Sequence, residues 1–123
     1  MPDPRHALGQ RAEQATASWL ASRGWTILAR RWRCADGELD IVALDPDAVL
    51  VAVEVKVRRG GRAGDPLESV GRLRLVRLRA ALGRFRAAVP MPVGNGLRID
   101  LVAVRSATAG RWRATHLRGV DAW

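Results

Sequence analysis

The sequence has few residues that could cross-link the chain or anchor it in a membrane. Its 123 residues include one cysteine, Cys34, so no disulfide can form within the chain. No apolar run approaches the roughly 20 residues that a membrane span needs. Residues 1–6 carry no apolar signal-peptide core. We therefore expect a cytoplasmic protein with no membrane association.

The motifs of several enzyme classes are also missing. The two histidines, His6 and His116, lack the spacing of a zinc site, and we expect both at the surface. No nucleophile elbow, dinucleotide fingerprint or phosphate-binding P-loop occurs, and the chain has no internal repeat. Cys34 lacks neighbouring residues that would activate it, so we expect a half-buried thiol.

Lysine is nearly absent, although the chain is strongly basic. Lys56 is the single lysine among 21 lysine and arginine residues, and the formal net charge is +9. Nucleic acid is the first partner to consider for so basic a small domain, with an anionic membrane surface or a ribosomal context as the alternatives. Because lysine carries a compact ammonium and arginine a planar guanidinium, a lone lysine favours a role that arginine cannot fill.

The clearest pattern in the chain is a pair of strands joined by a tight turn. Residues 37–44 and 49–58 are rich in aliphatic and β-branched side chains, and residues 45–47 between them form a typical turn sequence. The second run would be an ordinary buried strand, except that Glu54 and Lys56 interrupt it. Residues two apart on a strand share one face, so we expect these charges side by side.

Asp40 joins this face if the hairpin has one particular register. Pairing Asp45 with Val49 leaves a three-residue loop, which is common in hairpins, and places Asp40 opposite Glu54. Two carboxylates about 5 Å apart repel by about 3 kcal/mol at an effective dielectric of about 20. Lys56 would compensate this repulsion, and a divalent metal ion would do so more strongly.

Two interpretations stay open at this point. Glu54 and Lys56 could form a self-satisfied pair at a sheet edge, as partly exposed strands often do. A register slip of one residue would also send Asp40 to the opposite face of the sheet. The other interpretation is a charged site that contains Asp40, Glu54 and Lys56.

A helix and a strand are predicted before the hairpin. Residues 5–22 carry an apolar stripe at helical spacing, and Gly24 ends the helix. The stripe consists of Leu8, Ala12, Ala15 and Trp19. Glu13 lies at its edge and, by itself, would be a solvated charge paired with an arginine. Residues 25–33 follow as the first strand.

Arginines gather after the hairpin. Residues 57–66 form a basic, glycine-rich loop that includes Arg58, Arg59 and Arg62 and is well placed to grip a nucleic-acid backbone. Residues 66–89 have the pattern of a long helix, with Arg74 at the margin of its apolar stripe and Arg77 on one flank. That stripe consists of Gly71, Leu75, Leu78, Leu82, Phe85 and Val89.

Two more strands complete the expected sheet. They cover residues 97–104 and 111–117, and the last is expected at an edge. Arg98 and Asp100 share a face of the first of these strands and are positioned to pair with each other.

The ordered set of these segments resembles a known protein family. Asp40, the hairpin turn and Glu54-Val55-Lys56 resemble the PD-(D/E)xK nuclease core. The wider set resembles the bacterial YraN family, small uncharacterised proteins with a restriction-endonuclease-like fold that are similar to archaeal Holliday-junction resolvases. The resemblance covers nearly the whole chain and rests on Gly9 with Glu13, Gly37-Glu38-Leu39-Asp40, Val53-Glu54-Val55-Lys56-Val57-Arg58, residues 64–70 and Arg98-Ile99-Asp100.

The resemblance implies one α/β domain over residues 1–123. Its restriction-endonuclease-like core would be a mixed β-sheet flanked by helices, in the order α-β-β-β-α-β-β. It would bind nucleic acid, with DNA as the first candidate. It would act as a metal-dependent endonuclease on branched or structured DNA. Asp40, Glu54 and the Val55 carbonyl would hold Mg²⁺ or Mn²⁺, Lys56 would act in catalysis, and Glu13 would complete the site.

The sequence leaves two other functions open. One is a binding module for branched or single-stranded nucleic acid that retains the site without turnover. The other is a ribosome-associated or protein-interaction role that rests on charge alone. Arg58, Arg59, Arg62, Arg74 and Arg77 are the expected nucleic-acid contacts. Lysine is common in the family where Arg74 stands, and a homodimer is left open.

Overall fold

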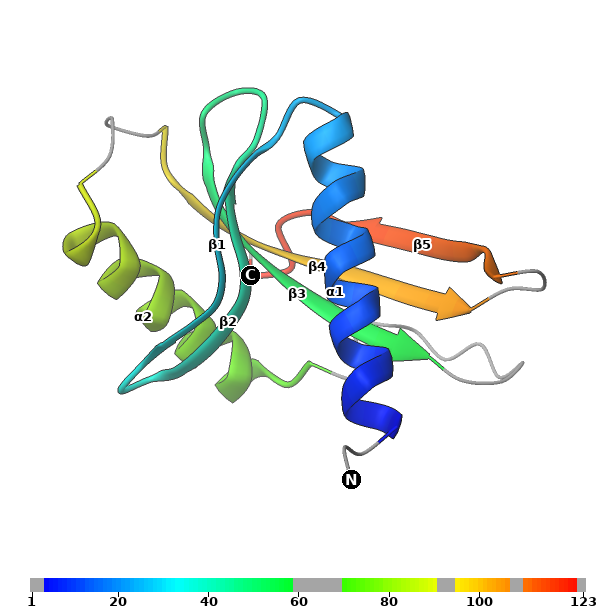
Figure 1. The fold of residues 1–123 in the computed structure, drawn as a ribbon. Helices are drawn as coiled ribbons and strands as arrows, with labels where there is room; N and C mark the ends of the chain where they lie inside the picture. The colour runs from blue at the N-terminus through cyan, green and yellow to red at the C-terminus, as the bar shows by residue number, and fades with distance from the viewer. Residues whose placement is uncertain (1–3, 59–69, 91–94, 107–109, 122–123) are drawn as a thin grey trace.

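The order of helices and strands confirms the predicted α/β arrangement. The computed structural model describes residues 4–58, 70–90, 95–106 and 110–121. The described residues form two helices and five strands in the order α-β-β-β-α-β-β, which can be followed in Figure 1. Their bounds are α1 Pro4–Ser22, β1 Thr26–Cys34, β2 Gly37–Leu44, β3 Leu50–Arg58, α2 Arg72–Ala88, β4 Leu97–Ser106 and β5 Trp112–Leu117.

The five strands form one mixed sheet in the order β1-β2-β3-β4-β5. Only β3 and β4 are parallel, and every other neighbouring pair is antiparallel. A parallel pair needs a crossover connection, and the segment between β3 and β4 contains α2. Among the described strands, β5 pairs with β4 alone, so the predicted edge strand is confirmed.

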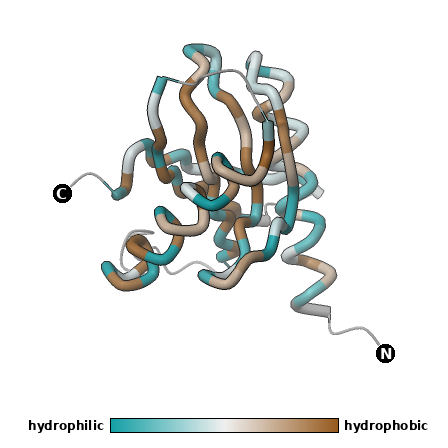
Figure 2. The backbone as a smooth tube through the Cα atoms, turned by 90° about the vertical axis from the view of Figure 1, so that its left-hand side faces the viewer, coloured by the Kyte–Doolittle hydropathy of each residue, from teal (hydrophilic) through white to brown (hydrophobic). Residues whose placement is uncertain are grey.

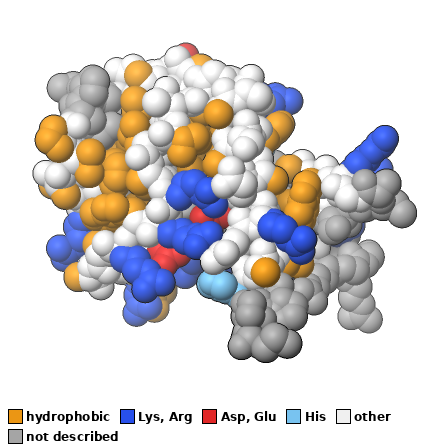
Figure 3. Space-filling model, viewed as in Figure 1, with side chains coloured by type: hydrophobic (Ala, Val, Ile, Leu, Met, Phe, Trp, Pro, Cys, Tyr) orange, Lys and Arg blue, Asp and Glu red, His pale blue; other side chains and the backbone are white. Residues whose placement is uncertain are grey.

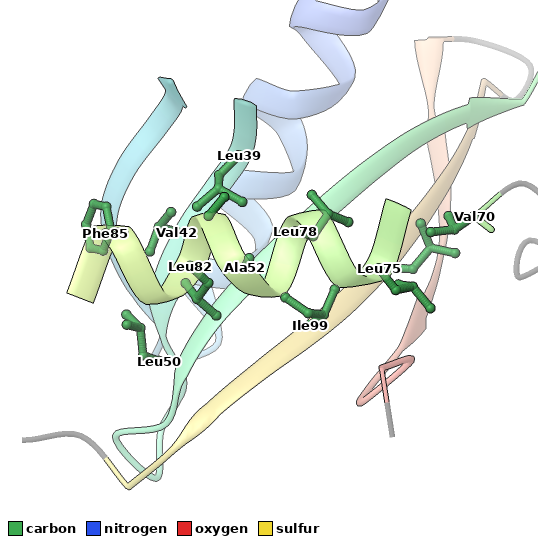
Figure 4. Close-up of a cluster of buried hydrophobic side chains, with 12 residues drawn as sticks. Leu39, Val42, Leu50, Ala52, Val70, Leu75, Leu78, Leu82, Phe85 and Ile99 are labelled. Carbon is green, nitrogen blue, oxygen red and sulfur yellow. The ribbon is translucent and has the colours of Figure 1, made fainter. Parts of the chain in front are cut away.

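The helices cover opposite faces of the sheet. Alternate residues of β3 belong to different apolar clusters: Ala52 packs with α2 residues, whereas Val51 and Val53 pack with α1 residues. Because strand side chains alternate between faces, the two clusters define three layers, helix, sheet and helix. Figure 4 shows Leu78 and Leu82 of α2 against the sheet residues of one cluster. In Figure 2, the apolar residues concentrate along the strands at the centre.

The face that α1 buries differs from the prediction. Ala15 and Trp19 of the expected stripe are only half-buried, as is Leu8. Ala12 of that stripe is buried as predicted, and the helix also turns Glu13, Thr16, Ala17 and Leu20 to the sheet. Small residues allow close approach, and the Thr16 hydroxyl donates a hydrogen bond to the Ala12 carbonyl at 2.8 Å, which satisfies it inside the core.

The start of α2 also differs from the prediction. The first helical residue is Arg72, and Gly71 is an extended N-cap with φ −71° and ψ 162° rather than a member of the helical stripe. Val70, just before it, is also outside the helix and is buried in the cluster with α2. The predicted helix residues 66–69 lie outside the described residues. The remaining stripe residues Leu75, Leu78, Leu82 and Phe85 are buried as predicted.

A buried ion-pair network fixes the hairpin turn to β4 and β5. Arg98 donates to Asp100 at 2.8 and 3.1 Å and to Asp45 at 2.8 Å, so the predicted Arg98–Asp100 pair is confirmed. His116 lies 2.9 Å from Asp100 and packs against Trp19 and Trp25. The prediction of a surface His116 was wrong, because strand pairing brings it against a buried carboxylate.

Candidate active site

The hairpin has the register that brings Asp40 and Glu54 together. Ile41 pairs with Val53 and Leu44 with Leu50, which places Asp40 opposite Glu54 at the next position. The Asp45 amide donates to the Val49 carbonyl at 3.0 Å and closes the predicted three-residue loop.

The regular pairing of β2 with β3 ends beside Asp40. Ile41–Val53 is the last regular pair, and the Val55 amide donates instead to Oδ2 of Asp40 at 2.9 Å. The Asp40 carboxylate therefore replaces a main-chain acceptor at the point where the two strands separate. This contact fixes the side chain against the middle of the Glu54-Val55-Lys56 segment.

Asp40 and Glu54 are in direct contact, and the protein partly shields both carboxylates from solvent. Glu54 is only 4% exposed. Burial, followed by the charge of Glu54, raises the pKa of Asp40 from 3.8 to about 7, although the Val55 amide acts in the opposite direction. Below that pKa, a proton on Asp40 can be shared with Glu54; above it, two like charges face each other. A cation between the two carboxylates would relieve this repulsion.

Arg74 of α2 supplies one cation to this pair. It forms an ion pair with Glu54, although about half of the Arg74 side chain remains exposed. The hydrogen bond to Glu54 raises the pKa of Arg74, so the guanidinium stays charged. Arg74 thus neutralises Glu54, and a metal ion would have to share Glu54 with it or displace it.

Glu13 approaches the same region from α1. It is 7% exposed and forms ion pairs with Arg30 at 3.3 Å and Arg31 at 3.1 Å. Its charge also raises the pKa of Asp40. Glu13 is therefore a buried, paired carboxylate rather than a solvated helix charge. Across the part of the chain that the structure describes, no three His, Cys, Asp or Glu side chains are grouped closely enough to hold a metal ion.

Lys56 lies on the Glu54 face of β3. Val53, Val55 and Val57 pack toward α1, so the alternate residues Glu54 and Lys56 face the side of α2. Lys56 is half-buried and makes no ion pair with any residue in the described ranges.

The backbone of β1 is distorted at Arg31, next to Asp40 on the neighbouring strand β2. Arg31 has a left-handed φ of 50° and lies between the pairs Arg30–Ile41 and Trp32–Leu39. Successive strand residues normally point to opposite faces, yet Arg30 and Arg31 both reach Glu13. The left-handed residue makes this possible, and such outliers persist where the surroundings or a function require them.

Sequence reasoning missed the roles of Arg30 and Arg31 in this arrangement. In a regular strand, adjacent arginines would lie on opposite faces, so the pattern gave no reason to place both on Glu13. The only available signal was indirect: a glutamate on the buried face of a helix needs a positive partner.

The expected nucleic-acid contacts are only partly described. Arg77 is exposed on α2, Arg74 is beside Glu54, and Arg58 ends β3 in a half-buried position. Arg59 and Arg62, together with the predicted basic loop, lie outside the described residues. No helix within the described ranges is both long and apolar enough to cross a membrane.

These features define an α/β protein with a mixed five-stranded sheet and, where two strands separate, a carboxylate pair of buried Glu54 and half-buried Asp40. The chain belongs to the uncharacterised protein family UPF0102, whose model matches residues 12–104. This confirms the family that the sequence motifs indicated, while the restriction-endonuclease-like fold and the similarity to resolvases stay predictions.

Similar proteins align over almost their whole length. A UPF0102 protein of Beutenbergia cavernae is 44% identical over 94% of this chain and 97% of its own. A UPF0102 protein of an Arthrobacter species is 46% identical over 92% and 94%, respectively. A third, from Streptomyces griseus, is 43% identical over 95% and 98%. The family's own description assigns no activity.

Proposed function

We propose that this protein binds nucleic acid and hydrolyses phosphodiester bonds in branched or structured DNA with the help of a divalent metal ion. One observation carries the proposal: Asp40 and Glu54 contact each other across the hairpin in a largely buried setting, with Lys56 two residues beyond Glu54. Two carboxylates held together against their repulsion are typical of a site built for function rather than for stability.

The donor set suits Mg²⁺ or Mn²⁺. Both ions prefer hard oxygen ligands and are commonly held by one or two carboxylates, with water or substrate oxygens completing the shell. Asp40 and Glu54 would supply the carboxylates, and the Val55 carbonyl a third oxygen. A bound metal ion would supply Lewis acidity for the attack of water on a phosphodiester.

The remaining residues of the site have separate roles in this proposal. The Lys56 ammonium would orient the attacking water or stabilise the negative charge that develops on the phosphate. Glu13 would act at longer range, through a water molecule or through its effect on the charge of Asp40. Arg58, Arg74 and Arg77, with Arg59 and Arg62, would contact the nucleic-acid backbone.

A binding module without turnover is the second candidate. The Arg74–Glu54 ion pair favours it, because a guanidinium already occupies one of the two proposed metal ligands. In that case the basic surface would bind nucleic acid, and the carboxylate pair would not act on it. A homodimer, which the sequence leaves open, remains untested under either candidate.

Strand cleavage of branched and flapped DNA tests the choice. Wild type, Lys56→Arg and Glu54→Gln are compared with Mg²⁺ or Mn²⁺, and Asp47→Asn serves as a charge control on the exposed hairpin turn. Lys56→Arg should keep binding yet lose cleavage by about 100-fold or more, because a guanidinium cannot place a compact ammonium at the reacting oxygen. Glu54→Gln should lose cleavage through loss of metal and bind DNA at least as tightly.

The outcomes separate the two functions. Cleavage by wild type and Asp47→Asn, but not by the two site variants, supports the nuclease. Binding without cleavage by wild type, or equal cleavage by all four proteins, refutes the catalytic role of the site. DNA binding that is undetectable at low salt would count against both candidates.

A further inference from the structure

An open pocket between α1 and β1 is lined by three arginines, two of which pair with Glu13. Its volume is about 580 Å³, and its lining residues are Ala7, Gln10, Arg11, Gln14, Arg30 and Arg31. None of them is among the expected nucleic-acid contacts. Figure 3, which views the α1 face, shows Lys and Arg side chains gathered around acidic ones at its centre.

The charges of this pocket are not balanced by its own residues. Glu13 is the carboxylate that pairs with Arg30 and Arg31, and it serves both guanidinium groups. Arg11 adds a third positive charge at the rim and is exposed. Three guanidinium groups with one buried carboxylate leave an excess of positive charge, which an anion in the pocket would offset.

The pocket also contains a donor without an acceptor. Nε of Arg30 is buried and has no hydrogen-bond partner among the described residues, while its terminal nitrogens reach Gln14 and Glu13. Buried polar groups are nearly always hydrogen-bonded, so an orphaned guanidinium N–H is consistent with a missing acceptor.

The backbone of β1 places its two arginines on one side of the strand. The left-handed φ of Arg31 keeps Arg30 and Arg31 on the same face, where their planar groups converge. Guanidinium groups bind tetrahedral oxyanions well because their N–H donors form a fixed fork. The side chains of Gln10 and Gln14 line the same pocket; Nε2 of Gln10 lies 2.9 Å from Nε2 of His6, and Oε1 of Gln14 accepts a hydrogen bond from Arg30.

We propose that this pocket, lined by Arg11, Arg30 and Arg31, binds a phosphate group of a nucleic-acid backbone. The proposal rests on the proposed function and adds to it a route for the strand: over the α1–β1 face, in addition to the arginines near β3 and α2. Glu13 would then hold the two β1 arginines beside the bound phosphate, because Arg30 and Arg31 both donate to it.

Arg11→Gln is the variant that tests the pocket. It removes an exposed charge that pairs with no described carboxylate, whereas changes at Arg30 or Arg31 would leave Glu13 buried without a partner. Arg113→Gln, exposed on β5 at the opposite edge of the sheet, is the matched control. Duplex and branched DNA are titrated against each protein over a range of salt, and thermal melts confirm folding.

If the pocket binds one backbone phosphate, Arg11→Gln should make the slope of log affinity against log salt shallower by about 0.9, while Arg113→Gln leaves it unchanged. Equal slopes for wild type and Arg11→Gln, with wild type still binding DNA, would overturn the pocket and leave the proposed function intact. An equal decrease in the salt slope for Arg11→Gln and Arg113→Gln would also overturn the proposal, because the slope would then depend only on the total charge of the protein.

A second measurement distinguishes the source of the phosphate. Inorganic phosphate, a 5′-mononucleotide and a short oligonucleotide are added separately while the Arg30 Nε–H signal is followed by NMR. All three should move the signal in wild type, with the oligonucleotide acting at the lowest concentration, and phosphate should move it far less in Arg11→Gln. Movement with inorganic phosphate alone, and none with the oligonucleotide, would contradict a backbone site even if DNA binds elsewhere.

Discussion

Asp40 is held where an ionised carboxylate is unfavourable. The Val55 amide stabilises its charge, but burial and the charges of Glu54 and Glu13 act more strongly in the opposite direction. The pKa of about 7 means that the folded protein binds a proton more tightly than the unfolded chain does. Stability from this group is therefore fully present below about pH 4 and is lost as the pH rises through about 7.

Replacing Asp40 with Asn should stabilise the protein in the upper part of this range. Asparagine can still accept the hydrogen bond from Val55 and can donate one to Glu54. We expect Asp40→Asn to gain roughly 2 kcal/mol at about pH 8 and clearly less at about pH 5. Urea unfolding at both values measures the difference.

Asp47→Asn is the control for this prediction, since Asp47 is exposed in the same hairpin. It should change stability little at either pH. A loss of stability in Asp40→Asn at high pH, or a gain of the same size at both values, would mean that the Asp40 carboxylate is not under strain from its neighbours.

Asp45, at the turn of the same hairpin, should show the opposite pH dependence. Although burial alone would raise the pKa of Asp45, hydrogen bonds from the Val49 and Asp47 amides and from Arg98 hold it below its usual value. Such a group contributes stability above its unfolded pKa of about 4, and this is lost as the pH falls through the folded value.

Asp45→Asn should therefore destabilise the protein at neutral pH, by about 1–2 kcal/mol, because the charged hydrogen bond to Arg98 is weakened. The difference in free energy of unfolding between wild type and Asp45→Asn should disappear as the pH falls below about 4, because wild type then loses the contribution of the Asp45 charge. Unfolding by guanidinium chloride, at neutral pH and at several acidic pH values, measures the stability of wild type and of Asp45→Asn. A gap that stays constant with pH would show that the Asp45 charge is not the source of the effect.

At the scale of elements, the hairpin was predictable because its determinants are local. The turn residues, the three-residue loop and the β-branched runs favour the register that places Asp40 opposite Glu54, although they leave a slip of one residue open. The loop nevertheless contains a residue that sequence reasoning did not single out. Ala48 has a φ of 63°, a conformation that glycine adopts without steric penalty.

Ala48→Gly should stabilise the hairpin by about 0.5–1 kcal/mol, since relief of the left-handed strain exceeds the entropy that glycine adds to the unfolded chain. Both main-chain hydrogen bonds of Ala48, to Asp45 and from Asn95, are retained. Ala35→Gly, in the exposed turn between β1 and β2 and without a positive φ, should be destabilising instead. Thermal melts of both variants decide whether the backbone of Ala48 is strained.

The helix faces were harder to predict than the hairpin. In α1, the apolar periodicity favoured Ala15 and Trp19, whereas the sheet accepts a face that includes Glu13 and Thr16. Those polar groups are tolerated because partners from outside the helix or from its own backbone satisfy them, and such partners are invisible in a helical pattern. The same holds for Arg31, whose left-handed conformation depends on tertiary contacts.

At the scale of the whole molecule, the element order and the mixed sheet were predictable, while the assembly of the site was predictable only in part. Asp40, Glu54 and Lys56 lie on one hairpin, so local rules bring them together. Arg74 reaches Glu54 from 20 positions away in the chain, and Arg31 reaches Glu13 from 18. Contacts of this kind depend on how the helices dock on the sheet, which single-sequence patterns do not determine.

The net charge of +9 makes a prediction for the whole molecule. Affinity for DNA should weaken steeply with salt, with a slope of about −0.9 per phosphate neutralised on duplex. Titrations of a duplex and of a four-way junction over a range of salt measure this slope and any preference for branched DNA. A slope near zero would mean that the basic surface does not contact the DNA backbone.

The proposed site for a divalent cation lies between Asp40 and Glu54. Soaking crystals in Mn²⁺ at about pH 8, above the pKa of Asp40, and recording anomalous diffraction tests it most directly. We predict a peak about 2.1 Å from one oxygen of each carboxylate, with the Arg74 guanidinium displaced or reoriented, and no peak in Asp40→Asn crystals. A map without density between the two carboxylates, with Arg74 still paired with Glu54, would contradict this proposal.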